Sequence, residues 1–362
     1  MATGPAKHLS LPKKILFSVI TVSLLFTIIE GGLRISGFRL ESQYSIFSEK
    51  KWLTHGVGQD PTLPWSWIPI PGAVCIIDRE LSFRFNALGT RGPLFQKEKV
   101  PDSLRIICMG DSGTMGWGVK DGEMYCSGIQ EILERRCERS VETINAGVFG
   151  YTSFQGLHQL KNRIVELHPD IITICYNWND HAPAIRISNG SQSTESEKGI
   201  PAPDKALHTP RSYSGFLRLV SSLRIFQLMQ YGALKTRELF PDPGNEQNSA
   251  SGLLRVALED YKNNLENMIT LARDNKITPI LLTQAFNPKS AMRPNLHAQY
   301  KKQQQYNDAI REVASTMNVA CVDPTTVLET DARFFNSNTH PTKPGHRKIA
   351  MLLADAIVSK CN

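Results

Sequence analysis

The sequence predicts an α/β protein in which a mainly parallel sheet is covered by helices on both faces. From Leu104 onward, apolar strand-like runs alternate with segments of helical periodicity, a pattern that is typical of parallel sheets. A chain of 362 residues that is 41% hydrophobic can bury a large core. We expect three parts: a membrane anchor over 1–36, a small β-rich lead-in over 37–100, and an α/β domain over 101–362 with an insertion at 181–252.

The N-terminal segment has the features of a membrane anchor. Lys13 and Lys14 precede an uncharged run from Ile15 to Ile29. A helix that continues to Leu33 would rise about 28 Å, close to the roughly 30 Å hydrocarbon core of a bilayer. A cleaved signal peptide starts in the same way, but no A-x-A cleavage site follows the run, and a buried core helix would not be apolar on every face. The early lysines favour a cytoplasmic N-terminus, so we expect the bulk of the protein outside the cytoplasm.

The remaining elements can be assigned in chain order. In the lead-in, the stretch LSFRFNALGTRG at 81–92 predicts a strand and a turn. Apolar runs predict sheet strands at 104–109, 142–146, 170–175, 278–283 and 319–322. Apolar residues at helical spacing predict helices near 125–133, 157–167, 254–268, 306–317 and 349–357.

The insertion breaks this alternation. It begins with a polar stretch that we expect to be an exposed loop, in which Asn189-Gly190-Ser191 matches a glycosylation acceptor. A strongly apolar segment at 216–234 then predicts a helix packed on the domain, with a lid or a membrane-resting surface as the alternatives.

Charge and cysteine usage exclude several classes of protein. The net charge of +7 arises from 41 Lys and Arg against 34 Asp and Glu spread along the chain, so no nucleic-acid partner is expected. The seven cysteines include no C-x-x-C pair and no zinc-finger spacing, so we expect neither a metal site nor a full disulfide framework. Cys126 and Cys137 should share one helix, about 16 Å apart and too far for a bridge. Cys108 and Cys175 should be core residues.

Polar residues follow the predicted strands at the edge where open parallel sheets bind ligands. Gly110-Asp111-Ser112 follows the first strand, where a serine can act as a nucleophile or merely cap a helix. Gly147 and Gly150 follow the second strand and allow a backbone N–H to approach a ligand closely. Asn179 follows the third strand and can either donate to a developing negative charge or stabilise its loop.

Two histidines lie close to the last predicted helix. His340 immediately precedes Pro341, and a histidine at such a junction is well placed to act as a general base. For His346, six residues later, we expect a capping or packing role.

The order of these blocks resembles the GDSL or SGNH hydrolase family: GDS at 110–112, the turn at Gly150, N-W-N-D at 177–180 and H-P at 340–341. The resemblance covers roughly residues 80–358. It implies a flavodoxin-like three-layer sandwich and ester hydrolysis or acyl transfer without a metal or organic cofactor. It also implies that Ser112 is the nucleophile and His340 the general base. The oxyanion would be held by the backbone N–H groups of Ser112 and Gly150 and by the Asn179 amide.

Two positions depart from the family pattern. Asn177 replaces a glycine, which a left-handed turn would accept. Ser337 stands three residues before the histidine, where the family has an aspartate, and a serine can orient an imidazole without offsetting its charge. Three explanations are open. Ser337 or a backbone carbonyl could support a Ser-His dyad, or Asp331 or Asp323 could replace the missing acid. In the third explanation, the protein is an enzyme that has lost activity. We favour a working or weak dyad, because the other family residues are all present.

The function expected from the sequence is that of a membrane-anchored serine esterase. Its expected substrates are O-acyl esters, with O-acetyl groups on a glycan or an exported polymer as the leading case. The alternatives are an O-acyltransferase that passes the acyl group to a sugar hydroxyl, and a non-catalytic binding module of the same fold. The expected partners are the acylated substrate and, through the N-terminal helix, a membrane.

Overall fold

The computed structural model describes residues 10–36, 56–63, 66–77, 81–187, 200–205, 223–225, 228–229 and 253–361. The chain divides into two compact units. The larger unit comprises Ile46–Ile185, Ala202–Thr209 and Ser251–Asn362, and it contains the sheet and all the predicted site residues.

The sheet of the larger unit has five strands, and all of them run parallel. Its strands are β5 (Leu104–Gly110), β6 (Val141–Asn145), β7 (Ile171–Cys175), β10 (Thr278–Leu282) and β11 (Ala320–Val322). Their spatial order is β11-β10-β7-β5-β6. Counted along the chain this is the order 2-1-3-4-5 of flavodoxin-like sheets, so the expected α/β fold class is confirmed. The order reverses at β5, so a ligand site is expected outside the carboxyl ends of β5 and its neighbours.

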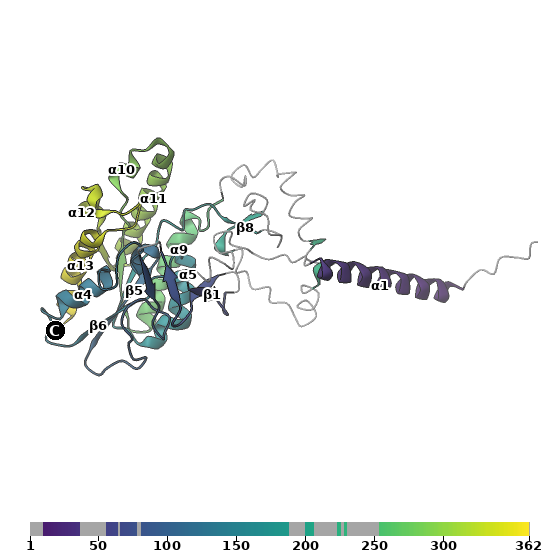
Figure 1. Ribbon diagram of the computed structural model, residues 1–362, viewed down its shortest axis with the longest axis horizontal. Helices are drawn as coiled ribbons and strands as arrows, with labels where there is room; N and C mark the ends of the chain where they lie inside the picture. The colour runs from purple at the N-terminus through teal and green to yellow at the C-terminus, as the bar shows by residue number, and fades with distance from the viewer. Residues whose placement is uncertain are drawn as a thin grey trace, which may run out of the picture. The chain divides into compact units, whose positions relative to one another are not determined.

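Helices cover both faces of this sheet (Figure 1). One face packs against α4 (Tyr125–Leu133), α12 (Thr325–Leu328) and α13 (Lys343–Ile357), and the other carries α5 (Ser153–Gln159), α9 (Leu258–Asp274) and α11 (Pro294–Thr316). Every residue of β5 is buried, because alternate side chains enter the two cores. Leu104, Ile106 and Cys108 belong to the core shared with α4 and α13. Burying a side chain of this size contributes on the order of 1.5–3 kcal/mol.

Short elements connect these layers. They are α3 (Ser112–Met115), α10 (Pro288–Ala291), a π-helical turn at Leu160–Ile164, and 3-10 turns at Val165–Leu167, Ala332–Phe334 and Val358–Lys360. The helix expected at 306–317 is longer than its apolar periodicity indicated, since α11 begins at Pro294.

The lead-in forms two antiparallel hairpins, which confirms a small β-rich addition. β1 (Val57–Gln59) pairs with β2 (Trp67–Pro69), and β3 (Val74–Ile76) pairs with β4 (Ser82–Arg84). Trp67 is fully buried, its indole Nε1 donates to the Phe149 carbonyl at 3.0 Å, and its own carbonyl accepts from the Tyr151 hydroxyl at 2.6 Å. The lead-in therefore packs on the loop that contains Gly150.

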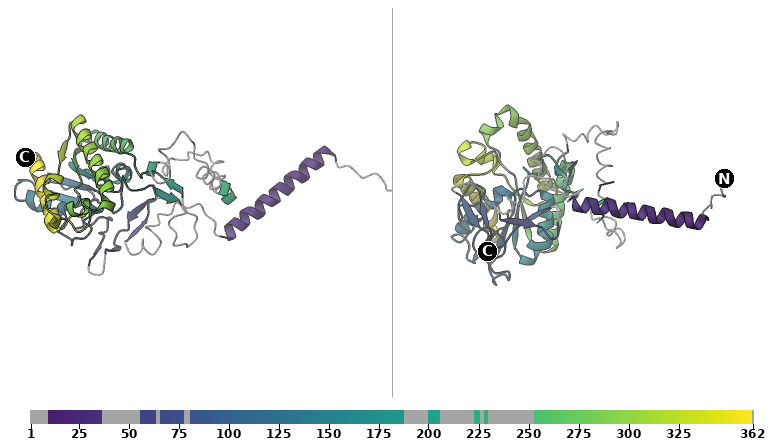
Figure 2. Two further views of the ribbon diagram at one scale, coloured as in Figure 1. Left: turned by 90° about the horizontal axis from the view of Figure 1, so that it is seen from above. Right: turned by 45° about the vertical axis from the view of Figure 1, so that its right-hand side comes forward.

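In the smaller unit, α1 (Leu11–Ile35) is one continuous helix of 25 residues (Figure 2). Pro12 lies in its first turn, where the missing N–H has no intrahelical partner to lose. Among the residues that the structure describes, α1 is the one helix long and apolar enough to cross a membrane, and a signal sequence would share those features. Its apolar side chains are exposed, unlike those of a buried core helix.

Little of the insertion belongs to the described residues. β8 (Ile185–Ile187) and β9 (Ile200–Ala202) form a two-stranded sheet. The Asn189-Gly190-Ser191 motif lies outside the described part of the chain, as does most of the apolar segment at 216–234.

The cysteines differ from expectation at one point. α4 ends at Leu133, so Cys137 does not share a helix with Cys126; it forms a disulfide with Cys361, with 5.2 Å between the Cα atoms. The sequence spacing did not predict this bridge, because the packing of α4 against α13 brings residues together that are 224 positions apart. Cys108 and Cys175 are buried in β5 and β7 as expected.

Candidate active site

Ser112 and His340 lie together beyond the carboxyl end of the sheet. The Ser112 hydroxyl Oγ is 2.8 Å from His340 Nε2, although the two residues are 228 positions apart. Ser337 Oγ is 2.8 Å from the other imidazole nitrogen, Nδ1. Both partners are hydroxyls, which can donate or accept; with the proton on Nδ1, the ring donates to Ser337 and Nε2 accepts from Ser112, which is the arrangement that a general base needs.

The turn between β5 and α3 directs Ser112 toward the imidazole. Asp111 is the N-cap of α3 and accepts from the Gly113 N–H at 2.8 Å, so the capping role belongs to the aspartate and not to the serine. A side chain at Gly110 would collide with Thr114 and with the Cys175 carbonyl, so the residue must be glycine. Burial raises the pKa of Asp111 to about 6, while hydrogen bonds from Gln284 and Gly113 oppose that rise.

A closed turn holds His340 from the other side. The Asn336 N–H donates to the His340 carbonyl at 2.8 Å, and the Asn336 amide donates to the Gly118 and Pro341 carbonyls. Burial lowers the pKa of His340 to about 4, because the charged imidazolium would lose its hydration there. The ring is therefore neutral at pH 7 and able to accept a proton.

The three expected oxyanion donors lie in the segments that follow β5, β6 and β7. Within residues 81–187 and 253–361, the backbone N–H groups of Ser112 and Gly150 have no hydrogen-bond acceptor. Gly150 has a φ of 74°, a left-handed conformation that favours glycine. Asn179 Nδ2 donates to the Tyr151 carbonyl at 3.0 Å, and its second proton faces Asp111 Oδ2 over a long 3.4 Å contact.

An aromatic side chain that the sequence did not single out borders this site. The Trp117 indole stacks on the His340 imidazole, with 6.2 Å between centroids and 30° between planes, and its centroid is 5.9 Å from that of Phe149. Gly116 and Gly118 flank it at φ values of 90° and 88°. A lone aromatic between two glycines after the Gly-Asp-Ser turn is the signal that would have pointed to it.

A buried arginine holds the Trp117 loop. The Arg91 guanidinium donates to the Gly116 and Val119 carbonyls at 2.6 Å and to Asp121 at 2.8 Å. It also lies 4.0 Å from the centre of the Phe83 ring. The lead-in thus supports two loops of the site, through Trp67 and through Arg91.

A family model described as GDSL-like lipase/acylhydrolase matches residues 108–348, about two thirds of the sequence. The chain belongs to this family. None of the curated proteins compared with this GDSL-like acylhydrolase matches it.

Solved structures with similar folds have low sequence identity to this acylhydrolase. The lipase/acylhydrolase from Enterococcus faecalis is 15% identical, with 71% of this chain and 96% of the other covered and a TM-score of 0.45. LAE5, an α/β hydrolase enzyme from the Lake Arreo metagenome, is 19% identical, with 72% and 96% covered and a TM-score of 0.45. Axe2, an acetylxylan esterase from Geobacillus stearothermophilus, is 16% identical, with 72% and 94% covered and a TM-score of 0.43.

Of the alternatives for the missing family aspartate, only Ser337 lies at the imidazole. The Asp331 carboxylate caps a 3-10 turn and binds Arg333 Nε at 2.7 Å. Asp323 accepts from Thr283 and Thr325 and pairs with Arg311. In the described part of the chain, neither carboxylate forms a hydrogen bond or ion pair with His340.

The Asn177 departure has a different explanation from the one expected. Asn177 is not among the residues with positive φ; its side chain is buried and its amide donates to the Gln303 carbonyl and to Asn307 Oδ1. Asn177 thus joins a buried polar network between the β7 loop and α11, in a turn that is not left-handed.

The remaining polar residues of these blocks have structural contacts. Asp180 is buried and accepts from the Ser153 N–H and hydroxyl at the start of α5, and burial raises its pKa to about 8. For His346 a capping or packing role was expected, and the structure shows both: the side chain is buried, Nδ1 accepts from the Tyr125 N–H at the start of α4, and the ring stacks on Tyr125. The described residues of this acylhydrolase contain no group of three or more His, Cys, Asp or Glu that could hold a metal ion.

Proposed function

We propose that this protein is a serine esterase in which Ser112 is the nucleophile and His340 the general base. The observation that carries the proposal is the 2.8 Å contact between Ser112 Oγ and His340 Nε2. Membership of an acylhydrolase family supports hydrolysis of an acyl ester as the reaction.

In the first half of the reaction, Ser112 Oγ attacks the acyl carbonyl carbon while its proton passes to His340 Nε2. The resulting tetrahedral oxygen accepts hydrogen bonds from the Ser112 and Gly150 N–H groups and from the Asn179 amide. The carbon–oxygen bond to the alcohol then breaks, and the alcohol leaves with the proton from Nε2. In the second half, water attacks the acyl-enzyme by the same route, releasing the acid and restoring Ser112.

Asn179→Ala should lower kcat by about 100-fold or more, because the loss of one oxyanion donor costs on the order of 3 kcal/mol. Turnover of p-nitrophenyl acetate would measure this, with KM changing little. Asn263→Ala, an exposed asparagine on α9, serves as the control. Near-normal turnover in Asn179→Ala would remove Asn179 from the oxyanion site.

The acid limb of kcat/KM should have an apparent pKa near 4, because burial lowers the pKa of His340 to about 4 from its ordinary 6.5. Above this pH the imidazole is neutral and accepts the Ser112 proton; below it the ring is protonated and activity is lost. A profile from pH 3.5 to 8, with circular dichroism to verify folding, would test this. Burial raises the pKa of Asp111 to about 6, so this carboxyl could add a second step to the same profile. Asp111→Asn removes that step, and the acid limb that remains belongs to His340. An acid limb near 6.5 in that variant would contradict the prediction.

The proposed substrates are small O-acyl esters, O-acetyl groups above all, on a glycan or an exported polymer. Trp117 supports this choice, because a flat aromatic ring beside the imidazole offers a surface on which a sugar ring can pack. Product analysis with and without a sugar acceptor separates hydrolysis from acyl transfer: free acid indicates an esterase, and acylated sugar an O-acyltransferase.

We further propose that α1 anchors the protein in a membrane with the α/β domain outside the cytoplasm. A helix of 25 residues spans about 37 Å, more than a bilayer core. The Cys137–Cys361 disulfide supports an oxidising compartment for the domain. Protease added to intact spheroplasts should digest the domain and spare an N-terminal tag; the reverse pattern would overturn this topology.

A further inference from the structure

A buried ion pair links the insertion to the loop that contains Gly150. Arg255 and Asp204 are 6% and 0% exposed. The guanidinium meets the carboxylate at two points, Nη2 to Oδ2 at 3.0 Å and Nε to Oδ1 at 3.2 Å. Burying two charges costs several kcal/mol per ion, so such a pair is weak evidence for stability and invites a functional explanation.

The remaining contacts of the pair are with the Gly150 loop and the start of α5. Arg255 Nη1 donates to the Gly150 carbonyl at 2.7 Å, and Nη2 donates to Gln155 Oε1 at 2.8 Å. Asp204 Oδ2 accepts from the Thr152 hydroxyl at 2.7 Å. Thr152 and Gln155 form the capping box of α5, so the ion pair binds both partners of that box.

The backbone fixes Arg255 in place. Its N–H donates to the Ala182 carbonyl at 2.9 Å, and its carbonyl accepts from the Asp204 N–H at 2.8 Å. The next residue, Val256, donates to the Asp180 carbonyl at 3.0 Å. The backbone at Arg255 and Val256 is therefore bound to the loop after β7, which contains Asn179, while the Arg255 guanidinium binds the loop after β6, which contains Gly150.

We propose that Arg255, oriented by Asp204, is a positioning residue: by holding the Gly150 carbonyl it fixes the loop conformation in which the Gly150 N–H can bind the oxyanion. This inference rests on the proposed esterase function. Gly150 lies in the left-handed region and can rotate more easily than other residues. The Gly150 N–H belongs to the peptide whose carbonyl is that of Phe149, and Trp67 Nε1 binds that carbonyl at 3.0 Å. With the Gly150 carbonyl bound to the guanidinium as well, the peptides on both sides of the Gly150 Cα are held, so the N–H cannot easily turn away from the site. A pre-oriented donor stabilises the tetrahedral oxygen without reorganisation at the moment of reaction.

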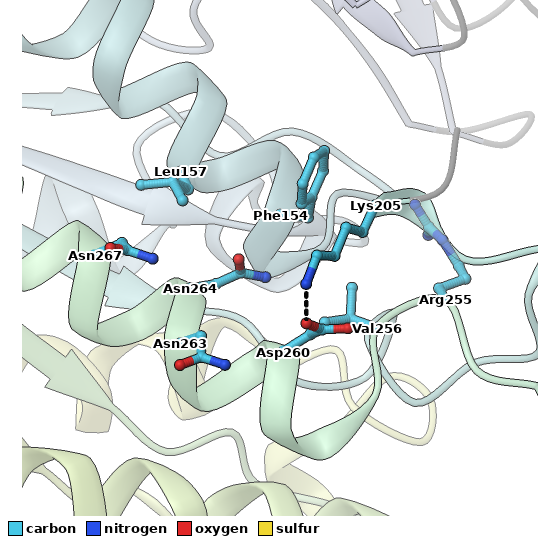
Figure 3. A pocket seen from close by; sticks show the side chains of 9 residues that line it. All are labelled: Phe154, Leu157, Lys205, Arg255, Val256, Asp260, Asn263, Asn264 and Asn267. Atoms are coloured by element: carbon cyan, nitrogen blue, oxygen red, sulfur yellow. Dashed lines mark hydrogen bonds and ion pairs between the residues drawn. The ribbon is translucent and has the colours of Figure 1, made fainter. Parts of the chain in front are cut away.

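The surroundings of Arg255 make the proposal testable by chemical rescue. Arg255 lines a pocket of about 390 Å³ between α5 and α9, together with Phe154 and the Lys205–Asp260 ion pair (Figure 3). Truncation to alanine would join the vacated volume to this pocket, so that a free guanidinium ion can enter it.

Arg255→Ala should lower kcat for p-nitrophenyl acetate by about 10- to 100-fold, near the lower end of the effect of losing an oxyanion donor. KM should change less than about twofold, and labelling of Ser112 by a fluorophosphonate should slow in parallel. Guanidinium chloride at about 20 mM, well below denaturing concentrations, should restore part of kcat. Lys205→Ala, in the same pocket, is the matched control and should keep wild-type kcat in both conditions.

A second variant covers the case in which Arg255→Ala fails to fold. Arg255→Lys keeps the charge but loses the planar fork, so we expect a folded protein with kcat reduced at least about tenfold. Wild-type kcat in either folded variant would overturn the inference. It would also be overturned if the loss of kcat in Arg255→Ala equalled the unfolded fraction of that variant and guanidinium did not restore it. If the wild-type protein itself neither reacts with the probe nor turns over ester, the proposed function fails instead.

Discussion

Ser112→Ala should abolish fluorophosphonate labelling and lower ester turnover by at least about 10³-fold. The variant removes the atom that forms the acyl-enzyme, while the oxyanion donors and His340 remain, and in serine hydrolases those donors alone leave only a small residual rate. Mass spectrometry of the probe-labelled protein gives the first readout, and hydrolysis of p-nitrophenyl acetate gives the second.

Ser315→Ala is a suitable control for this experiment, because Ser315 is exposed near the end of α11 and follows none of the strand ends that carry the proposed site. It should label and turn over as the wild type does. If Ser112→Ala were still labelled at wild-type rate, the nucleophile would be elsewhere. If the wild-type protein were never labelled but bound acylated ligands, the non-catalytic binding module would be the better description.

Ser337→Asp should raise kcat by about tenfold or more and move the acid limb of kcat/KM upward by 1–3 pH units. A carboxylate at Nδ1 stabilises the imidazolium that forms during catalysis, and an adjacent opposite charge raises the pKa of a histidine by about that amount. The 2.8 Å contact between Ser337 Oγ and Nδ1 places the new carboxylate at the correct nitrogen. Because the pKa of His340 is about 4, its imidazole is a weak base, and a neighbouring carboxylate would make it a stronger one.

The companion variant Ser337→Ala removes the hydrogen bond that orients the imidazole, so it should lower kcat without shifting the acid limb upward. The two variants together distinguish orientation from charge. Unchanged kcat and an unchanged pH profile in Ser337→Asp would mean that residue 337 does not face His340 during catalysis, and a different partner at Nδ1 would then be required.

Much of the fold could be predicted because its signals are local. Apolar runs and helical periodicity located the five sheet strands and the helices between them, since buried parallel strands are apolar on both faces. The positions of Ser112, Gly150 and Asn179 directly after strands also predicted that they share one edge of the sheet. The end of α4, which separates Cys126 from Cys137, carried no comparably strong signal.

The contacts that support the site were not predictable in the same way. The Cys137–Cys361 bridge and the packing of Trp67 on the Phe149–Tyr151 loop join segments that are 224 and more than 80 residues apart. The contact between Arg255 and Gly150 spans 105 residues. No spacing rule connects such residues, since each depends on how separate helices and hairpins pack.

By itself, the sequence determined the α/β class, the apolar N-terminal helix and the residues that follow each strand, because periodicity and turn chemistry act over a few neighbouring positions. Only the tertiary structure decided that Ser337, rather than Asp331 or Asp323, meets His340, and that Asn177 joins a buried network instead of a left-handed turn. These choices depend on side-chain directions after the chain has closed on itself. A difference of a few ångströms there separates a hydrogen bond from no contact at all.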